Sequence, residues 1–142
     1  MSFIKIIVSV IGLICFLFFV LGLKSQKGVA PGLVDGKLSD MGAAPNAVSS
    51  EIDTQPEKKL APITGTRSAI RDAIIATGGT ITSETETYLS ATYMSPIFKF
   101  VDDVELRHEK ESIWHIRSAS RVGYSDRGVN RRRVETIRAQ IN

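Results

Sequence analysis

Residues 117–135 read RSASRVGYSDRGVNRRRVE, and the expected fold depends on how this stretch is accommodated. It holds six arginines but only two carboxylates, Asp126 and Glu135. Such a run must be paired by the rest of the fold, held out for a ligand, or both. Residues 84–111 carry seven acids against three bases, and adjacent segments of opposite charge tend to pair with each other. We therefore expect the arginine-rich stretch to fold back against the acidic segment.

The junction of these two segments has the alternation of an antiparallel hairpin. Residues 101–107 and 112–121 are the expected strands, with a four-residue loop at 108–111. The register that sets apolar residues opposite each other gives the pairs Leu106–Trp114, Val104–Ile116 and Asp102–Ser118 on one face, and Asp103–Arg117 and Glu105–His115 on the other. A shift by one residue would mix the two faces, so the apolar match favours this register.

The remaining periodic segments predict a two-layer α+β domain. Residues 80–83 and 88–93 are rich in β-branched and aromatic residues and are expected to be strands. A helix is predicted from Thr66, with apolar side chains at positions 70, 73 and 74, and a last helix begins near Asn130, a suitable N-cap. The expected fold is an antiparallel sheet of about four strands with two helices on one face.

Residues 1–24 are expected to be a transmembrane anchor. Phe3 to Leu23 is almost entirely apolar, and its 21 residues would span about 31 Å as a helix. A cleaved signal peptide is the alternative, but the run exceeds the usual apolar region of such peptides, and no Ala-x-Ala site follows it. Residues 25–43, with several glycines and no sustained period, are expected to form a flexible linker to a domain at 44–142.

Three ordered motifs carry a family resemblance: PNAVSS at 45–50, FVDDVEL at 100–106 and the arginine-rich stretch. Together they resemble the domain of unknown function family 1499, found in bacteria and plastids. The resemblance implies a small α+β domain that is often attached to a membrane or exported, and it implies no particular activity. The family typically has Cys where this chain has Ala47, so a thiol role would not apply here. The resemblance also implies a single-pass protein of the bacterial inner membrane, with its domain outside the cytoplasm.

Several polar residues are candidates for binding a ligand. Three arginines in the first turn of the last helix oppose the helix dipole, which is unfavourable unless acids or an anion lie nearby. The candidates are Asn46, Arg117, Ser120, Arg121, Tyr124, Arg131 and Arg133, with Asp102, Asp103, Glu105, Asp126 and Glu135 as supporting carboxylates. An alternative is that all of these residues only brace the fold.

These observations favour a non-enzymatic domain that binds a protein partner, or an anionic or lipid-like ligand, beside the lipid bilayer occupied by residues 3–23. The alternative is a membrane-tethered hydrolase that uses Ser120 or Ser125 with His115. No metal is expected, because strand alternation places Asp102 on the opposite face from Asp103 and Glu105. No cofactor is predicted, and the near-neutral charge of residues 44–142 argues against nucleic acid.

Overall fold

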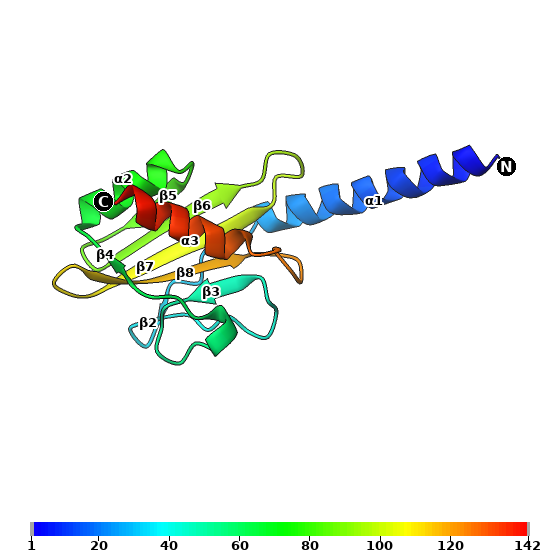
Figure 1. Cartoon of the computed structure of the whole chain (residues 1–142). Coiled ribbons are helices and arrows are strands. Elements are labelled where there is room, and N and C mark those ends of the chain that lie inside the picture. Colours follow the sequence, from blue (N-terminus) through cyan, green and yellow to red (C-terminus); the bar gives the residue numbers. More distant parts are fainter. Residues whose placement is uncertain (1, 142) are drawn as a thin grey trace.

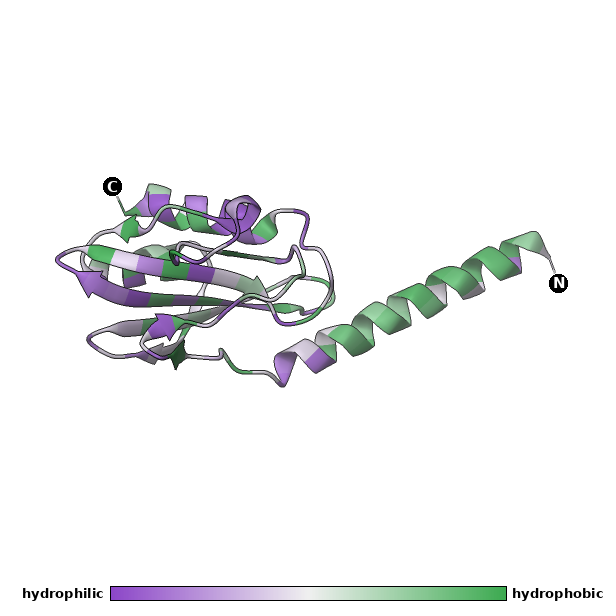
Figure 2. Cartoon of the chain, turned by 90° about the horizontal axis from the view of Figure 1, so that it is seen from below, coloured by the Kyte–Doolittle hydropathy of each residue, from purple (hydrophilic) through white to green (hydrophobic). Residues whose placement is uncertain are grey.

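The computed structural model describes residues 2–141, which form one long helix and an α+β domain (Figure 1). The helix α1 (Phe3–Gln26) projects from the domain, and its first twenty residues are hydrophobic over most of their length (Figure 2). Its 24 residues are long and apolar enough to cross a membrane. A signal sequence near the N-terminus would satisfy the same criterion.

The domain is built on an antiparallel sheet. Its strand order is β3 (Ala47–Ser49), β8 (Ile113–Ser120), β7 (Val101–Lys110), β6 (Tyr88–Met94) and β5 (Thr80–Glu84). The short β4 (Ile63–Thr64) pairs with the start of β8, beyond the end of β3. The predicted fold class is confirmed, although the sheet has six strands instead of about four.

The predicted register of the central hairpin is wrong by two residues. Leu106 lies opposite Ile116, and Glu105 lies opposite Arg117. The expected loop at 108–111 is replaced by a tight turn after Lys110, with an irregularity between His108 and Lys110 and a positive φ of 50° at Glu111. A shift by two residues leaves every side chain on its predicted face, because side chains alternate with a period of two. The apolar pattern therefore could not exclude it.

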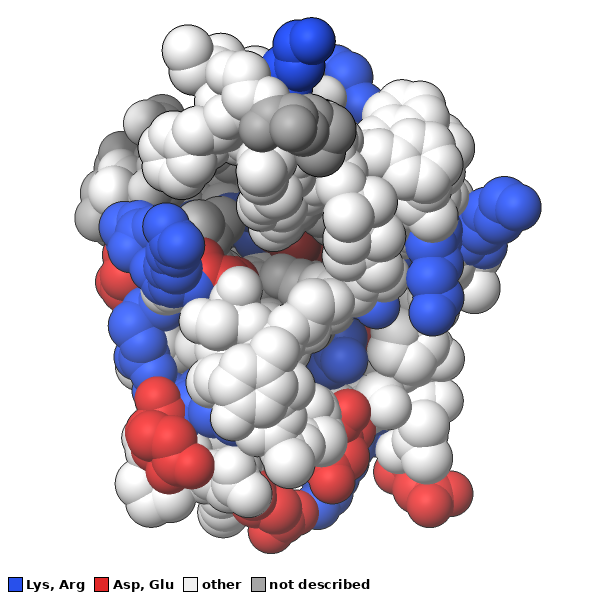
Figure 3. Space-filling model, turned by 90° about the vertical axis from the view of Figure 1, so that its right-hand side faces the viewer, with Lys and Arg blue, Asp and Glu red and all other residues white. Residues whose placement is uncertain are grey.

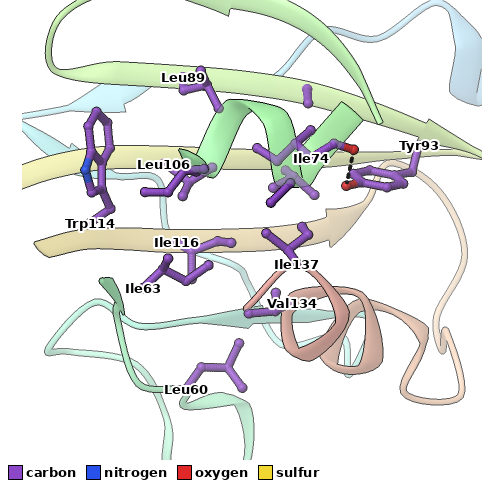
Figure 4. Close-up of a cluster of buried hydrophobic side chains, with 14 of the residues drawn as sticks. Leu60, Ile63, Ile74, Leu89, Tyr93, Leu106, Trp114, Ile116, Val134 and Ile137 are labelled. Atoms are coloured by element: carbon purple, nitrogen blue, oxygen red, sulfur yellow. Dashed lines mark hydrogen bonds between the residues drawn. The ribbon is translucent and has the colours of Figure 1, made fainter. Parts of the chain in front are cut away.

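One face of the sheet carries the hydrophobic core and both domain helices, α2 (Arg67–Ala76) and α3 (Val129–Gln140). Figure 4 shows side chains of both helices meeting those of the sheet. The largest fully buried hydrophobic side chains of the core are Ile63, Ile70, Ile74, Leu89, Val104, Leu106, Ile116, Val134 and Ile137. Each such side chain contributes roughly 1.5–3 kcal/mol by leaving water. This layer therefore supplies most of the hydrophobic stabilisation of the domain.

The start of α3 differs from the prediction, because Asn130 is not its N-cap. Gly128 precedes the helix with a φ of 78°, and the Asp126 carboxylate accepts hydrogen bonds from the backbone N–H groups of Gly128 and Asn130 at 2.9 and 2.7 Å. Asn130 is instead fully buried, and its side chain bonds Ser118 and the Asn46 carbonyl. A carboxylate at the N-terminus of a helix interacts favourably with the helix dipole. This interaction offsets the unfavourable effect of the arginines in the first turn.

The other face of the sheet is covered by residues 28–41, which we call the covering segment. This segment, expected to serve as a flexible linker, contains a small hairpin of β1 (Leu33–Val34) and β2 (Lys37–Leu38). The backbone N–H groups of Gly32 and Leu38 donate to the carboxylates of Glu105 and Glu51 at 2.8 and 3.0 Å. Beyond β3, the chain passes through a single 3-10 turn, η1 (Pro56–Lys58), before reaching β4.

Candidate functional site

The face of the sheet under the covering segment is polar. Since Leu89, Leu106 and Ile116 point into the core, their neighbours along each strand point to this second face. It presents Tyr88, Ser90 and Thr92 from β6, Asp103, Glu105 and Arg107 from β7, and His115 and Arg117 from β8, with Arg121 directly after that strand. Polar side chains that are buried in this way require partners. In the described chain the contacts on this face supply them, except that the buried Nε of Arg117 has no hydrogen-bond partner.

Three arginines of this face are held by carboxylates. Arg121 forms two parallel hydrogen bonds with Asp103, both 2.7 Å long, and this pairing raises the pKa of the Arg121 guanidinium above its usual value. Arg107 binds both oxygens of Glu51, the second at 2.8 Å. The third pair joins Nη1 of Arg117 to Oε2 of Glu105 at 2.9 Å. The positive charge of this face is therefore compensated within the fold.

Glu105 lies in the middle of this polar layer, and its side chain is fully buried. Besides Arg117, it accepts hydrogen bonds from the Tyr88 hydroxyl at 2.7 Å and from the Gly32 backbone at 2.8 Å. Burial, followed by the bond to Glu105, raises the pKa of Tyr88 well above its ordinary value. Three donors for one buried carboxylate satisfy the requirement that such a charge be paired and hydrogen-bonded.

Beside this layer the covering segment leaves an open hollow of about 620 Å³, which we call the groove. It follows the second face of β6 from Met94 to Tyr88, a length of about 20 Å for six residues of strand. Its lining consists of Gln26, Gly28, Val29, Ala30, Gly32, Thr82, Ser83, Tyr88, Ser90, Thr92, Met94, Val101 and Arg121. Within the groove, the apolar side chains lie nearest to α1, and the hydroxyl groups lie farther along β6. The volume falls in the range typical of small-molecule sites.

The groove begins at the end of α1. Ser25, in the last turn of the helix, is 1% exposed, and its hydroxyl accepts a hydrogen bond from the Val101 backbone at 3.1 Å. The Ser25 carbonyl in turn accepts a bond from Arg121 at 3.2 Å. Viewed from the side of α1, Lys and Arg lie mainly in the upper and middle parts of the surface, and Asp and Glu lie mainly in its lower part (Figure 3). The last turn of α1 is thus an integral part of the site.

The predicted ligand residues are divided between the two faces of the sheet. Arg117 and Arg121 lie on the second face, whereas Arg133 belongs to α3 and binds Asp102 at 2.6 Å. Arg131 donates to the carbonyls of Glu57 and Lys59, so it braces a loop. Of the remaining ligand candidates, Asn46 donates to the Gly123 carbonyl, Ser120 accepts from Asn130, and Tyr124 is 77% exposed. Glu135, predicted as a supporting carboxylate, binds Arg138. Arg121 is the one ligand candidate that lines the groove.

The serines proposed for a hydrolase do not contact His115 in the described chain. Its Nδ1 lies 3.2 Å from the hydroxyl of Ser50 instead. Ser50 is 3% exposed, and its hydroxyl also accepts a bond from the Ile116 backbone at 2.8 Å. This serine therefore ties the start of the domain to β8. Within residues 2–141, no group of three or more His, Cys, Asp or Glu is placed to hold a metal ion.

Apart from Arg121, the groove residues were not predicted from the sequence, because they do not form a dense cluster of charged residues. Thr82, Ser90 and Thr92 are ordinary polar positions of alternating strands, and Gly28 to Gly32 reads as a linker. The alternation of 88–93 did indicate that Tyr88, Ser90 and Thr92 share a face. What it could not indicate was the segment that covers them.

Comparison with known families gives one match: the family described as "Protein of unknown function (DUF1499)" matches residues 37–141. The match begins inside the covering segment and includes the whole sheet and both domain helices. No curated protein and no solved structure matches the chain.

Proposed function

The chain belongs to the DUF1499 family of proteins of unknown function, and we propose that it is a single-pass membrane protein whose domain binds a lipid-like molecule in the groove. The observation that carries this proposal is the position of the groove, which begins at the last turn of the apolar helix α1. A molecule leaving the bilayer would meet Val29, Met94 and Val101 first. Its tail would lie on these apolar side chains.

The hydroxyl-lined part of the groove favours a neutral hydrogen-bonding head group. Ser90 and Thr82 share one hydrogen bond of 2.8 Å, which leaves each hydroxyl with further capacity to donate or accept. Arg121 at the edge is neutralised by Asp103. Because no unpaired cation lines the groove in the described chain, a neutral amphiphile fits it better than a strongly anionic molecule.

The contacts of α1 support a retained anchor over a cleaved signal peptide. Removal of the helix would leave the Val101 N–H and one Arg121 donor without the partners that Ser25 supplies. Unpaired buried groups of this kind cost roughly 1–3 kcal/mol each. We place the domain outside the cytoplasm, on the bacterial inner membrane, as the family resemblance implies.

Filling the groove tests this function. We expect Thr92→Phe to exclude the ligand, because Thr92 lines the middle of the groove. The matched control is Thr87→Phe, which lies in the exposed turn between β5 and β6, outside the groove. Full-length protein is reconstituted in nanodiscs of phosphatidylethanolamine and phosphatidylglycerol and examined by native mass spectrometry.

Wild type and Thr87→Phe are expected to retain one tightly held lipid, and Thr92→Phe is expected to lose it. Lipids that merely surround α1 would be the same in all three proteins. Equal retention in the two variants would contradict the assignment of the groove. Retention of a co-purifying polypeptide that disappears with Thr92→Phe would instead identify a protein partner.

A further inference from the structure

The connection between β6 and β7, residues 95–100, packs against α1 through aromatic rings. The Phe18 ring lies 5.3 Å from that of Phe98 and 6.1 Å from that of Phe100, measured between centroids. The two loop rings are 6.3 Å apart and tilted edge to face. Such distances are those of favourable aromatic pairs. The loop therefore packs at a fixed position along the axis of α1, beside Phe18.

The backbones of the helix and the loop are also in contact. A Cβ atom added at Gly22 would lie 1.8 Å from the Phe98 carbonyl oxygen, so any larger residue would force them apart. Gln26 donates a side-chain bond to the Lys99 carbonyl at 3.3 Å. Lys99 itself has a φ of 57°, which turns the loop back toward Val101. These contacts fix the loop on α1 over two helical turns.

This geometry sets how deep the loop lies. Phe18 is five residues before Leu23, where the apolar run ends, and this corresponds to about 7.5 Å along the helix axis. The rings stacked on Phe18 must share that depth when α1 spans a bilayer. Ile97, at the tip of the same loop, is 78% exposed, and Met94 just before it is 57% exposed.

We propose that residues 95–100 are a second membrane-contacting element, inserted into the lipid interface beside α1. This inference rests on α1 being a membrane span, as proposed above. The loop contains two phenylalanines and an isoleucine, one lysine and no acid, a composition suited to lipid with a cation at the head groups. Two points of contact fix the tilt of the domain, and they hold the open end of the groove at the membrane surface.

Tryptophan quenching tests this insertion. The native Trp114 lies at the far end of the sheet, opposite His108 and about 23 Å along β7 from Val101, so it serves as an internal reference. Ile97→Trp adds a reporter at the exposed loop tip, and Phe19→Trp adds one on α1 beside Phe18, where the side chain is 52% exposed. Glu86→Trp, in the exposed turn at the far end of the sheet, is the control.

Full-length proteins are compared in phosphatidylcholine vesicles with and without lipids brominated along the upper part of their chains. We expect the emission added by Ile97→Trp and by Phe19→Trp to be lost, while wild type and Glu86→Trp keep theirs. Loss with Phe19→Trp but not with Ile97→Trp would overturn the loop insertion and leave the anchor intact. Loss with neither would overturn both the anchor and the insertion.

Discussion

Glu105 is the residue on which the covered face of the sheet depends. It is fully buried, and it holds Arg117, Tyr88 and the backbone of Gly32 together. Breaking a buried ion pair by removing one charge costs about 3–5 kcal/mol, because the remaining charge stays buried. Glu105 is therefore one of the two carboxylates, with Glu51, that hold the covering segment on the sheet.

Glu105→Gln is expected to lower the free energy of unfolding by about 3–5 kcal/mol, measured by urea denaturation of the full-length protein in detergent. Tyr88→Phe removes one hydrogen bond from the same carboxylate, and we expect it to cost about 1 kcal/mol. Equal stability of Glu105→Gln and wild type would show that the Arg117 pair contributes no net stability.

Glu51 makes stability sensitive to acid. Burial alone would raise the pKa of its carboxyl group, but hydrogen bonds from Arg107 and the Leu38 N–H outweigh burial and lower it. A carboxyl group with a lower pKa in the folded chain takes up a proton on unfolding at low pH. Its contribution to the free energy of unfolding is complete above its ordinary pKa and is lost as pH falls toward the folded value.

We therefore expect the urea midpoint to fall between about pH 6 and pH 3, and to fall less in Glu51→Gln than in wild type. Glu86→Gln, on an exposed turn, serves as the control and should follow the wild-type profile. A profile for Glu51→Gln as steep as that of wild type would place the acid sensitivity elsewhere.

Sequence reasoning at this scale predicted that acids and arginines pair, but it did not predict each partner. Arg117 was expected opposite Asp103 and lies opposite Glu105, while Asp103 binds Arg121. Strand alternation determines which face a side chain occupies, and a shift of two residues preserves every face. Partner identity therefore depended on the turn after Lys110, whose irregular geometry has no clear sequence signal.

At the scale of elements, the strands and helices with sustained periods were predictable and the short ones were not. Both domain helices and the strands from β6 to β8 follow apolar periods in the sequence, and β5 is rich in β-branched residues. β3 and β4 have three and two residues, too few to show a period. The covering segment is held mainly by backbone donors to Glu105 and Glu51, and backbone bonds leave no pattern of side chains.

The contact between α1 and the β6–β7 loop gives a prediction with a matched control. Gly22→Ala places a methyl group where the Phe98 carbonyl lies, whereas Gly12 has nothing within 4 Å of an added Cβ. Gly22→Ala is expected to separate the loop from the helix and weaken the bond from Val101 N–H to Ser25. Hydrogen exchange of residues 95–101 should then be faster than in wild type.

The Gly12→Ala protein should exchange at the wild-type rate, because an added Cβ at Gly12 meets no other atom. It is a matched control because it adds the same methyl group to the same helix. Slow exchange in Gly22→Ala would mean that the loop adapts without leaving α1. That result would remove the basis for a fixed loop depth.

At the scale of the whole molecule, the end of α1, the β6–β7 loop and the covering segment meet at one end of the domain. Gln26 at the end of α1, Met94 and Val101 on either side of the β6–β7 loop, and Arg121 line the groove, and the loop itself packs on α1. The composition of α1 predicted an anchor, and its length and hydropathy agree with a membrane span. The sequence could not indicate that the end of this helix is joined to the sheet, because Ser25 and Gly22 contact residues more than seventy positions away.

Photocrosslinking from inside the groove tests the central claim most directly. The full-length protein carries p-benzoylphenylalanine at Ser83, an exposed residue that lines the groove from β5, or, as the control, at Thr87, and cells are irradiated before purification. We expect the peptide containing position 83 to gain the mass of a lipid in the first protein and the peptide containing position 87 to gain none in the control. A polypeptide adduct at position 83, or lipid adducts of equal yield at both positions, would contradict a lipid-binding groove.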